Sequence, residues 1–302
     1  MRRGYTASNL ALFSVSSKIT VKENILVKNI IKKFFYFILD IINKNGSYVI
    51  SIIKINKHTL KSNNDANLLN LNIGSGGYNI EGFKDLDFSS NKYDLERSTK
   101  FIKYDLRKDP IPFEDNEVDN IYCSHVIEHI EDKHVDNFIK ESSRVLKKGG
   151  VLRLVTPDRE FLYEMLIKGG DYWRNNRITN WFYSRGIDLE KCDEIDFFIR
   201  EISTEKLRFF SEKNLKYYNE VKNNLHNYNY IFDILNQNSN WNEENMGNHI
   251  NSWDYEKIKK FSQGYFTSII KSKCKGSISK SMQGDAFDLT CPEMSIYVDL
   301  RK

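Results

Sequence analysis

The sequence predicts an α/β protein built on a doubly wound, mostly parallel sheet. Two observations carry this prediction: short apolar runs alternate with helical patterns from residue 68 onward, and several of those runs end in glycine or aspartate. Ligands of such sheets bind beyond the carboxyl ends of the strands, which is where these residues fall. With 302 residues, 40% of them hydrophobic and 28% charged, the chain can bury a core of ordinary size.

The individual elements follow from local patterns. Apolar runs bounded by polar or glycine residues predict seven strands, at 68–73, 83–88, 100–104, 118–124, 151–156, 265–270 and 294–300. A helix is expected over 126–146, because apolar residues recur there at helical spacing. Two lysines and two glycines follow at 147–150, which is a typical helix end. Another helix is expected from Trp253 through Phe261.

Residues 161–247 interrupt this alternation. They are rich in Tyr, Trp, Phe and Asn, with helical patterns at 161–167 and 204–221. We therefore expect a helical, aromatic-rich insertion after the fifth strand, which covers the ligand-binding edge of the sheet as a lid. The polar run 61–65 predicts a linker, so the main domain is expected to span 61–302.

Residues 1–60 differ in charge from the rest of the chain. They hold ten Lys and Arg against two Asp and Glu, a net charge of +8, whereas the remaining residues hold 35 against 39, a net charge of −4. Apolar residues between Ile30 and Ile42 predict a basic amphipathic helix. Such a helix either packs on its own domain or contacts an anionic membrane surface or a partner protein. The slightly acidic body argues against a nucleic-acid substrate, because phosphate contacts dominate such binding.

The protein is expected in the cytoplasm. Its four cysteines are widely separated and form no CxxC pair, which is typical of free thiols in a reducing compartment. The most apolar stretch, 34–55, carries Asp40, Lys44 and Lys54, so we do not expect it to span a membrane. A peripheral position at the inner face of the membrane, through residues 1–60, is the alternative location.

A glycine turn, within the run LNIGSGG at 71–77, directly follows the first predicted strand. Glycines there allow a ligand to approach the backbone closely. Position 79 is Asn79 rather than the third glycine of the dinucleotide fingerprint, which disfavours a nicotinamide cofactor. Asp87 and Asp105 end the next two strands, and a carboxylate at the first of these positions can accept both hydroxyls of a ribose.

The combination of motifs is more specific than any single one. The segment 67–158 holds, in order, LNIGSG at 71–76, Asp87, YDL at 104–106, IPFEDNEVD at 111–119, SHVIEHI at 124–130, ESSRVLKKGG at 141–150 and TPD at 156–158. This series closely resembles class I S-adenosylmethionine-dependent methyltransferases of the type 11 group, with weaker echoes at 261–266 and in the last strand. The resemblance implies a Rossmann-like fold, S-adenosyl-L-methionine as cofactor, and methylation as the reaction.

The resemblance also places cofactor contacts on matching residues of this chain. Asp87 is expected to bind the ribose hydroxyls; it follows Gly76 by only 11 residues, which implies a reduced helix between them. Asp105 is expected to meet the adenine amino group, and Leu106 to cover the adenine ring. The remaining expected contacts, along the ribose and the methionine, are Gly74, Ser75, Gly76, Ser124 and His125.

Residues 125–129 also spell H-x-x-E-H, the inverted zinc-protease motif. That chemistry needs both histidines on one helical face and a further acidic ligand. A strand is expected to end at Ser124, so His125 should lie in a loop before the helix. We therefore expect Glu128 in the first turn of the helix, His129 in a structural role and no bound metal. A zinc hydrolase that uses this segment stays open as a minor alternative.

For the methyl acceptor the sequence supplies only candidates. Asp158, after the fifth strand, and His249, ahead of the returning helix, are the candidate catalytic residues. The expected acceptor is a small molecule, or a saccharide in surface glycan biosynthesis, and a cofactor-binding scaffold without activity is an alternative. Aromatic residues of the insertion either form the core of a lid or stack on a sugar or aromatic substrate; they include Tyr172, Trp173, Trp181 and Tyr183.

Overall fold

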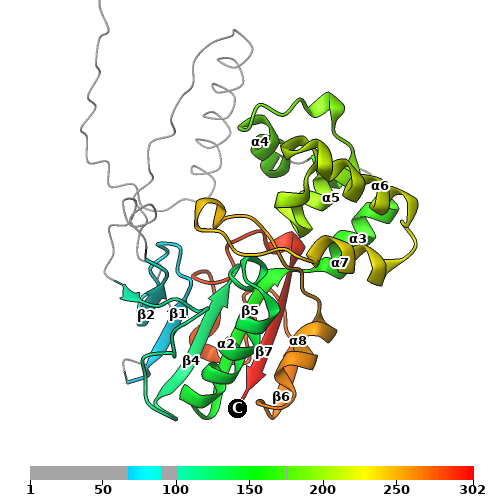
Figure 1. Ribbon diagram of the computed structural model, residues 1–302. Coiled ribbons are helices and arrows are strands. Elements are labelled where there is room, and N and C mark those ends of the chain that lie inside the picture. Colours follow the sequence, from blue (N-terminus) through cyan, green and yellow to red (C-terminus); the bar gives the residue numbers. More distant parts are fainter. Residues whose placement is uncertain (1–66, 90–100, 170, 175) are drawn as a thin grey trace, which may run out of the picture. The chain divides into compact units, whose positions relative to one another are not determined.

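The computed structural model describes residues 67–89, 101–169, 171–174 and 176–302, which fold around a seven-stranded sheet (Figure 1). The strands are β1 (Asn70–Ile73), β2 (Phe83–Asp87), β3 (Ile102–Lys103), β4 (Val118–Ser124), β5 (Leu146–Pro157), β6 (Ser268–Lys271) and β7 (Ser295–Arg301). Their spatial order is β3-β2-β1-β4-β5-β7-β6. The basic extension predicted at 1–60 and the linker predicted at 61–65 lie outside the described residues.

The sheet is mixed rather than wholly parallel. Strands β1 to β5 run parallel to their neighbours among themselves, whereas β7 runs antiparallel to both β5 and β6. The predicted fold class, a mostly parallel Rossmann-like sheet with a helical insertion after the fifth strand, is confirmed. The carboxyl ends of β1 to β5 meet at one edge, and the strand order reverses between β1 and β4, where such sheets bind ligands.

The described helices are α2 (Asp132–Val145), α3 (Arg159–Lys168), α4 (Asn176–Tyr183), α5 (Glu194–Ile202), α6 (Leu215–Asn223), α7 (Tyr228–Asn236) and α8 (Tyr255–Ser262). The helix predicted over 126–146 is divided: Ile127–His129 form a 3₁₀ turn, Ile130 is extended, and α2 begins only at Asp132. The helix predicted over 204–221 is only partly right, because three 3₁₀ turns precede α6. In the part of the chain that the structure describes, no helix is long and apolar enough to cross a membrane.

Alternation along the strands divides the apolar side chains between the two faces of the sheet. One face carries Ile121, Leu154 and Val298 and packs against α2 and α8 (Figure 1). The other face carries Tyr122, whose ring lies 5.1 Å from that of Phe287 in the segment between β6 and β7. The sheet is therefore buried on both faces, and the carboxyl edge is where a ligand can reach it.

The insertion 161–247 has a hydrophobic core of its own. Trp173, Phe182 and Phe198 are fully buried in this core, which α3 to α7 enclose. Trp173 is therefore closed to a substrate, whereas Tyr183 at the end of α4 is 73% exposed. The helical part begins directly after β5, so it is anchored at the carboxyl edge of the sheet.

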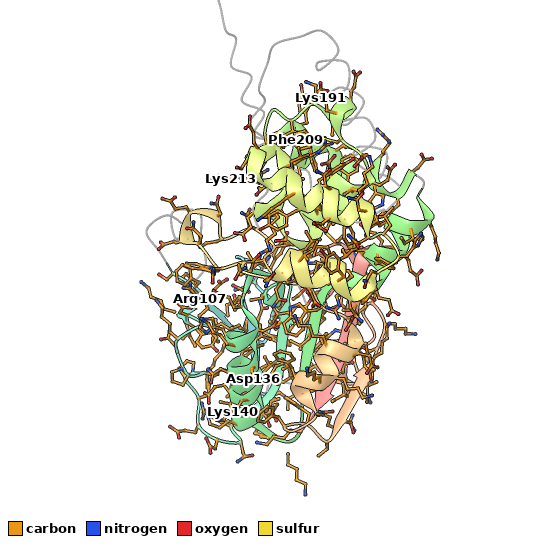
Figure 2. All side chains as sticks on the ribbon, turned by 45° about the vertical axis from the view of Figure 1, so that its right-hand side comes forward. Arg107, Asp136, Lys140, Lys191, Phe209 and Lys213 are labelled. Carbon is orange, nitrogen blue, oxygen red and sulfur yellow. The ribbon has the colours of Figure 1, made fainter. Side chains whose placement is uncertain are left out.

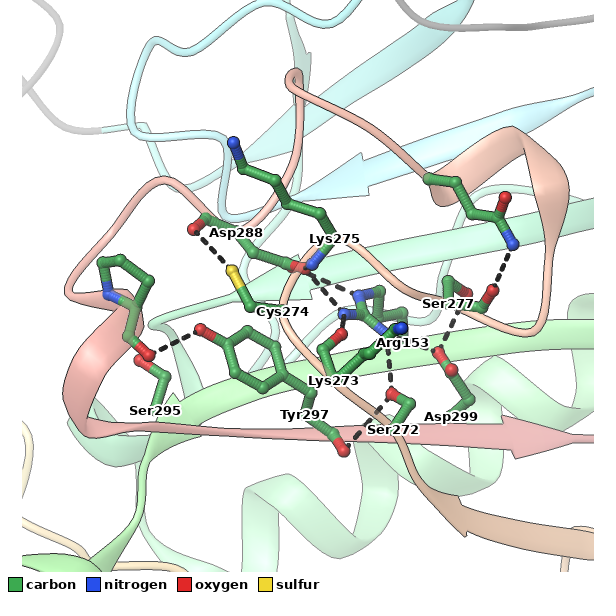
Figure 3. A network of polar contacts seen from close by, with 12 residues as sticks. Arg153, Ser272, Lys273, Cys274, Lys275, Ser277, Asp288, Ser295, Tyr297 and Asp299 are labelled. Carbon is green, nitrogen blue, oxygen red and sulfur yellow. Dashed lines mark hydrogen bonds and ion pairs between the residues drawn. The ribbon is translucent and has the colours of Figure 1, made fainter.

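A buried ion-pair network joins β5 and β7 to the segment between β6 and β7 (Figure 3). Arg153 of β5 is 0% exposed, and its guanidinium lies 2.6 Å from Asp288 and 3.0 Å from Asp299. Its other hydrogen bonds go to Ser272 Oγ and the Lys273 carbonyl, both at 2.9 Å. Because an unpaired buried charge is strongly destabilising, this network holds the segment against the sheet.

Candidate functional site

The turn after β1 has a backbone that glycine adopts most readily. Gly74 has a φ of +69° and Gly76 a φ of +55°, both in the left-handed region. A Cβ on Gly74 would lie only 2.2 Å from Cγ2 of Val126. The turn therefore brings its main chain against the residues that follow β4 and leaves no room for a side chain at position 74.

Asp87, at the end of β2, holds this turn in place. Its Oδ2 accepts hydrogen bonds from the Gly76 N–H at 2.7 Å and from Ser75 Oγ at 3.1 Å. Its Oδ1 accepts from the Phe88 N–H at 2.7 Å. The connection from β1 to β2 consists of turns and a bridge instead of a helix, and it brings the carboxylate back to the glycine main chain.

A cavity of about 240 Å³ opens at this edge of the sheet. The predicted cofactor residues in its wall are Gly74, Gly76, Asp87, Asp105, Leu106 and His125. The other two, Ser75 and Ser124, line a neighbouring cavity of about 230 Å³. The glycine turn and His125 border both cavities, which we call the first and the second cavity below. The insertion adds wall residues that sequence analysis missed, namely Trp241, Met246 and Gly247.

Arg107, which is labelled in Figure 2, is a further residue that sequence analysis missed, and it lines the first cavity. Its Nη2 and Nε donate to the two oxygens of Asp105 at 2.6 and 2.8 Å. Burial by itself raises the pKa of Asp105, but the hydrogen bonds and charge of Arg107 bring that pKa below its usual value. The Arg107 guanidinium also lies 3.3 Å from the ring centroid of Trp241. The Asp105 carboxylate is therefore paired with a guanidinium that stacks on an indole.

His125 occupies a strained position directly after β4. Its φ is +55°, which is uncommon for a residue other than glycine. Its Nδ1 lies 3.0 Å from Glu128 Oε1, and its Nε2 lies 2.9 Å from Ser295 Oγ. Left-handed backbone of this kind persists where the surroundings hold it, and here both ring nitrogens are held. The ring is therefore held in a fixed position where it borders both cavities.

The geometry of 125–129 does not form the inverted zinc-protease motif. His125 lies in a loop, as predicted, and His129 belongs to the 3₁₀ turn that follows, so the two histidines share no helical face. Glu128 lies in that turn rather than in the first turn of an α-helix, which corrects the prediction. The extended backbone at Ile130 separates the turn from α2.

Glu128 is 1% exposed, and its Oε2 accepts a hydrogen bond from Thr156 Oγ1 at 3.1 Å. Burial by itself raises the pKa of this carboxyl group, but the charge and hydrogen bond of His125, followed by the charges of His129 and His249, lower it to about 2. His249 is 6% exposed, and burial lowers the pKa of its imidazole to about 4. At neutral pH the carboxylate is therefore ionised and the His249 ring is uncharged.

The two candidate catalytic residues do not line either cavity. Asp158 caps α3 by accepting from the Glu160 N–H at 3.1 Å, and it forms a β-bridge with Trp253. Burial raises the pKa of Asp158. His249 hydrogen-bonds the Glu201 carbonyl through Nδ1. A catalytic role for Asp158 or His249 stays a prediction that the lining of these cavities does not support.

Residues 73–154 match a family model described as a methyltransferase domain. Among solved structures, the chain is similar to the YcgJ protein from Bacillus subtilis (22% identity over 35% of this chain and 54% of that one, TM-score 0.26). It is also similar to an S-adenosylmethionine-dependent methyltransferase from Mesorhizobium loti (20% identity over 32% of this chain and 49% of that one, TM-score 0.25). A third similar structure is a complex between the Haloferax volcanii Trm112 methyltransferase activator and a methyltransferase (10% identity over 82% of this chain and 85% of that one, TM-score 0.36). The match spans about half the length of the first two structures. A search of curated proteins finds no match.

Proposed function

We propose that the chain is an S-adenosylmethionine-dependent methyltransferase that acts on a small molecule or a saccharide, which the match of residues 73–154 to a methyltransferase-domain model supports. The observation that carries the proposal is the first cavity, where the glycine turn, Asp87 and the Asp105–Arg107 pair line one space. When bound, S-adenosylmethionine supplies a methyl group that its sulfonium already activates. The chain therefore has to hold the cofactor and the acceptor in line and to keep water out.

Each part of the cofactor has a matching wall in the first cavity. The carboxylate of Asp87 suits the ribose hydroxyls, and the buried side chain of Leu106 suits one face of the adenine. Trp241, stacked on Arg107, offers an aromatic surface in the same cavity. The glycine turn at Gly74 then leads the methionine end toward His125, at the border with the second cavity.

The second cavity is the proposed place of the acceptor, because it adjoins the glycine turn and His125. Its wall includes Tyr78, which is 52% exposed, together with the hydroxyl groups of Ser124 and Thr290. Among the residues that the structure describes, this wall holds no Lys, Arg, Asp or Glu. Such a lining suits an uncharged acceptor with several hydroxyl groups, such as a neutral sugar, and a role in surface glycan biosynthesis belongs to the same proposal.

The proposal is tested with the wild-type protein. We expect calorimetry to show saturable binding of S-adenosylmethionine, and a panel of neutral sugars and small hydroxyl compounds to contain an acceptor that releases S-adenosylhomocysteine. Absence of cofactor binding would contradict the cofactor site. Binding without turnover across the panel would contradict the acceptor assignment and favour the inactive scaffold.

Replacing Trp241 by Ala is expected to weaken cofactor binding by roughly 2- to 30-fold, because stacking and cation–π contacts of this kind contribute about 0.5–2 kcal/mol. The substitution removes the indole that Arg107 stacks on in the cavity wall. Calorimetry with S-adenosylmethionine measures the change. Tyr183→Ala, which removes an exposed ring of the insertion, is the control and should bind like the wild type. Equal affinity in both variants would remove Trp241 from the cofactor site.

A further inference from the structure

A cluster of three side chains that can ligate a metal ion lies beside the first cavity, which His129 lines. Glu128, His129 and His249 each offer one ligand atom, and these three atoms lie within 4.8 Å of one another. We propose that the three residues bind a divalent transition-metal ion of the Zn²⁺ class. This proposal departs from the sequence-based expectation of no metal, and it goes beyond the proposed methyl transfer, which does not require an ion.

The two imidazole rings are held so that the Nε2 atoms are left for a ligand. His129 Nδ1 lies 2.9 Å from the carbonyl oxygen of Asn248, and His249 Nδ1 hydrogen-bonds the carbonyl oxygen of Glu201. Because a carbonyl oxygen can only accept, each Nδ1 carries a proton, and in the neutral ring Nε2 is then the nitrogen whose lone pair can bind a metal. Histidines that bind metals in proteins are commonly fixed by a second hydrogen bond of this kind.

Glu128 supplies the negative charge of the site. Its Oε2 is occupied by Thr156, whereas its Oε1 lies 3.9 Å from His129 Nε2 and 3.0 Å from His125 Nδ1. Ligand distances of about 2.0–2.2 Å require the three donor atoms to draw together by a small side-chain movement. Two imidazoles and one carboxylate are a donor set that Zn²⁺ and similar ions favour, whereas Ca²⁺ and Mg²⁺ prefer oxygen ligands.

The position of the cluster leaves room for a further ligand. His129 lines the first cavity and also a small cavity of about 50 Å³ beside Asn240, Asn245 and Asn248. Three protein ligands leave a fourth position on a tetrahedral ion, which is the arrangement of catalytic zinc sites. A water molecule can take that position, and metal binding does not depend on the proposed methyl transfer.

Direct titration of the metal tests the proposal without an activity assay. Untagged full-length protein is freed of metal with a chelator and titrated with Co²⁺, whose visible absorption reports its coordination. We expect one ion per chain, displacement by Zn²⁺ but not by Mg²⁺, and a higher melting temperature with Zn²⁺, because an ion that binds only the folded chain stabilises it. His249→Gln and Glu128→Gln should weaken binding by roughly 100-fold, at least as much as the loss of a supporting hydrogen bond does.

Two control variants separate the site from adventitious histidine binding. His226 is exposed in the insertion and His134 is half-buried on α2, and His226→Gln and His134→Gln should bind Co²⁺ like the wild type. Absence of a saturable Co²⁺ spectrum in the wild type, or equal affinity in His249→Gln and His226→Gln, would overturn the proposal. Circular dichroism checks the fold of each variant, and the wild-type titration decides the question if His249→Gln does not fold. Because cofactor binding is measured separately, failure of the proposed methyl transfer leaves this result unaffected.

Discussion

Asp288→Ala is expected to lower the free energy of unfolding by about 3–5 kcal/mol, because it leaves a buried guanidinium without its nearest carboxylate. Arg153 is 0% exposed and donates to Asp288 through Nη2 at 2.6 Å and through Nε at 3.1 Å (Figure 3). Asp288 also accepts a hydrogen bond from the main-chain N–H of Lys275. Loss of the carboxylate therefore also loosens the segment between β6 and β7, which covers the face of the sheet that carries Tyr122. Urea denaturation followed by circular dichroism measures the change.

Asp285→Ala is the matched control for this prediction. Asp285 lies in the same segment and pairs with Lys275 at 2.7 Å, but its side chain is 96% exposed. Exposed ion pairs contribute little to stability, so the urea midpoint of this variant should match that of the wild type. If Asp288→Ala and Asp285→Ala had the same midpoint, the buried network would not be what holds the segment against the sheet.

Asp87→Ala is expected to weaken binding of S-adenosylmethionine by roughly 30- to 150-fold, the equivalent of about 2–3 kcal/mol for hydrogen bonds to a charged group. The substitution removes the proposed acceptor of the ribose hydroxyls. It also removes the acceptor for the Gly76 N–H and Ser75 Oγ, which loosens the turn. Calorimetry at fixed ionic strength measures the dissociation constant.

Two further variants separate these causes. Asp136→Ala makes the same charge change on the exposed side of α2, away from the cavity, and should bind the cofactor like the wild type (Figure 2). Asp87→Asn keeps an oxygen acceptor for the turn but loses the charge, so we expect an intermediate affinity. If Asp87→Ala bound as tightly as Asp136→Ala, the ribose would not lie at Asp87.

Most strands were predictable because their signals are local, but β5 also includes residues 147–150, which we expected to end the preceding helix. β4 spans Val118–Ser124, the same residues as the apolar run that predicts it. The predicted start of the helix at residue 126 is too early, because the spacing of Ile127 and Ile130 indicated a helix. Both side chains are buried in the core, but they belong to a 3₁₀ turn and to the extended residue that follows it. A periodic pattern reports which side chains are buried, but it does not tell a 3₁₀ turn with an extended residue from a continuous helix.

The wall of the first cavity, which is the proposed cofactor site, was predictable only in part. Gly74, Asp87 and Asp105 each follow a strand, so their place at the carboxyl edge depends on the order of local elements. Trp241 carries no such signal, because its contact with Arg107 depends on how the insertion returns to the sheet. Catalytic roles assigned from sequence position alone were the weakest predictions, as Asp158 shows by capping a helix outside both cavities.

The sequence by itself determined the strand order along the chain, the glycine turn and the acidic residues that follow the strands. These features depend on backbone geometry and burial within short segments. Only the tertiary structure decided that Arg153 is neutralised by Asp288 and that His249 meets Glu128 and His129. Such contacts join residues far apart in the chain, such as His129 and Asn248 at a separation of 119 residues. These contacts form through charge pairing and burial in the folded protein. The secondary-structure preference of the residues around each partner does not determine them.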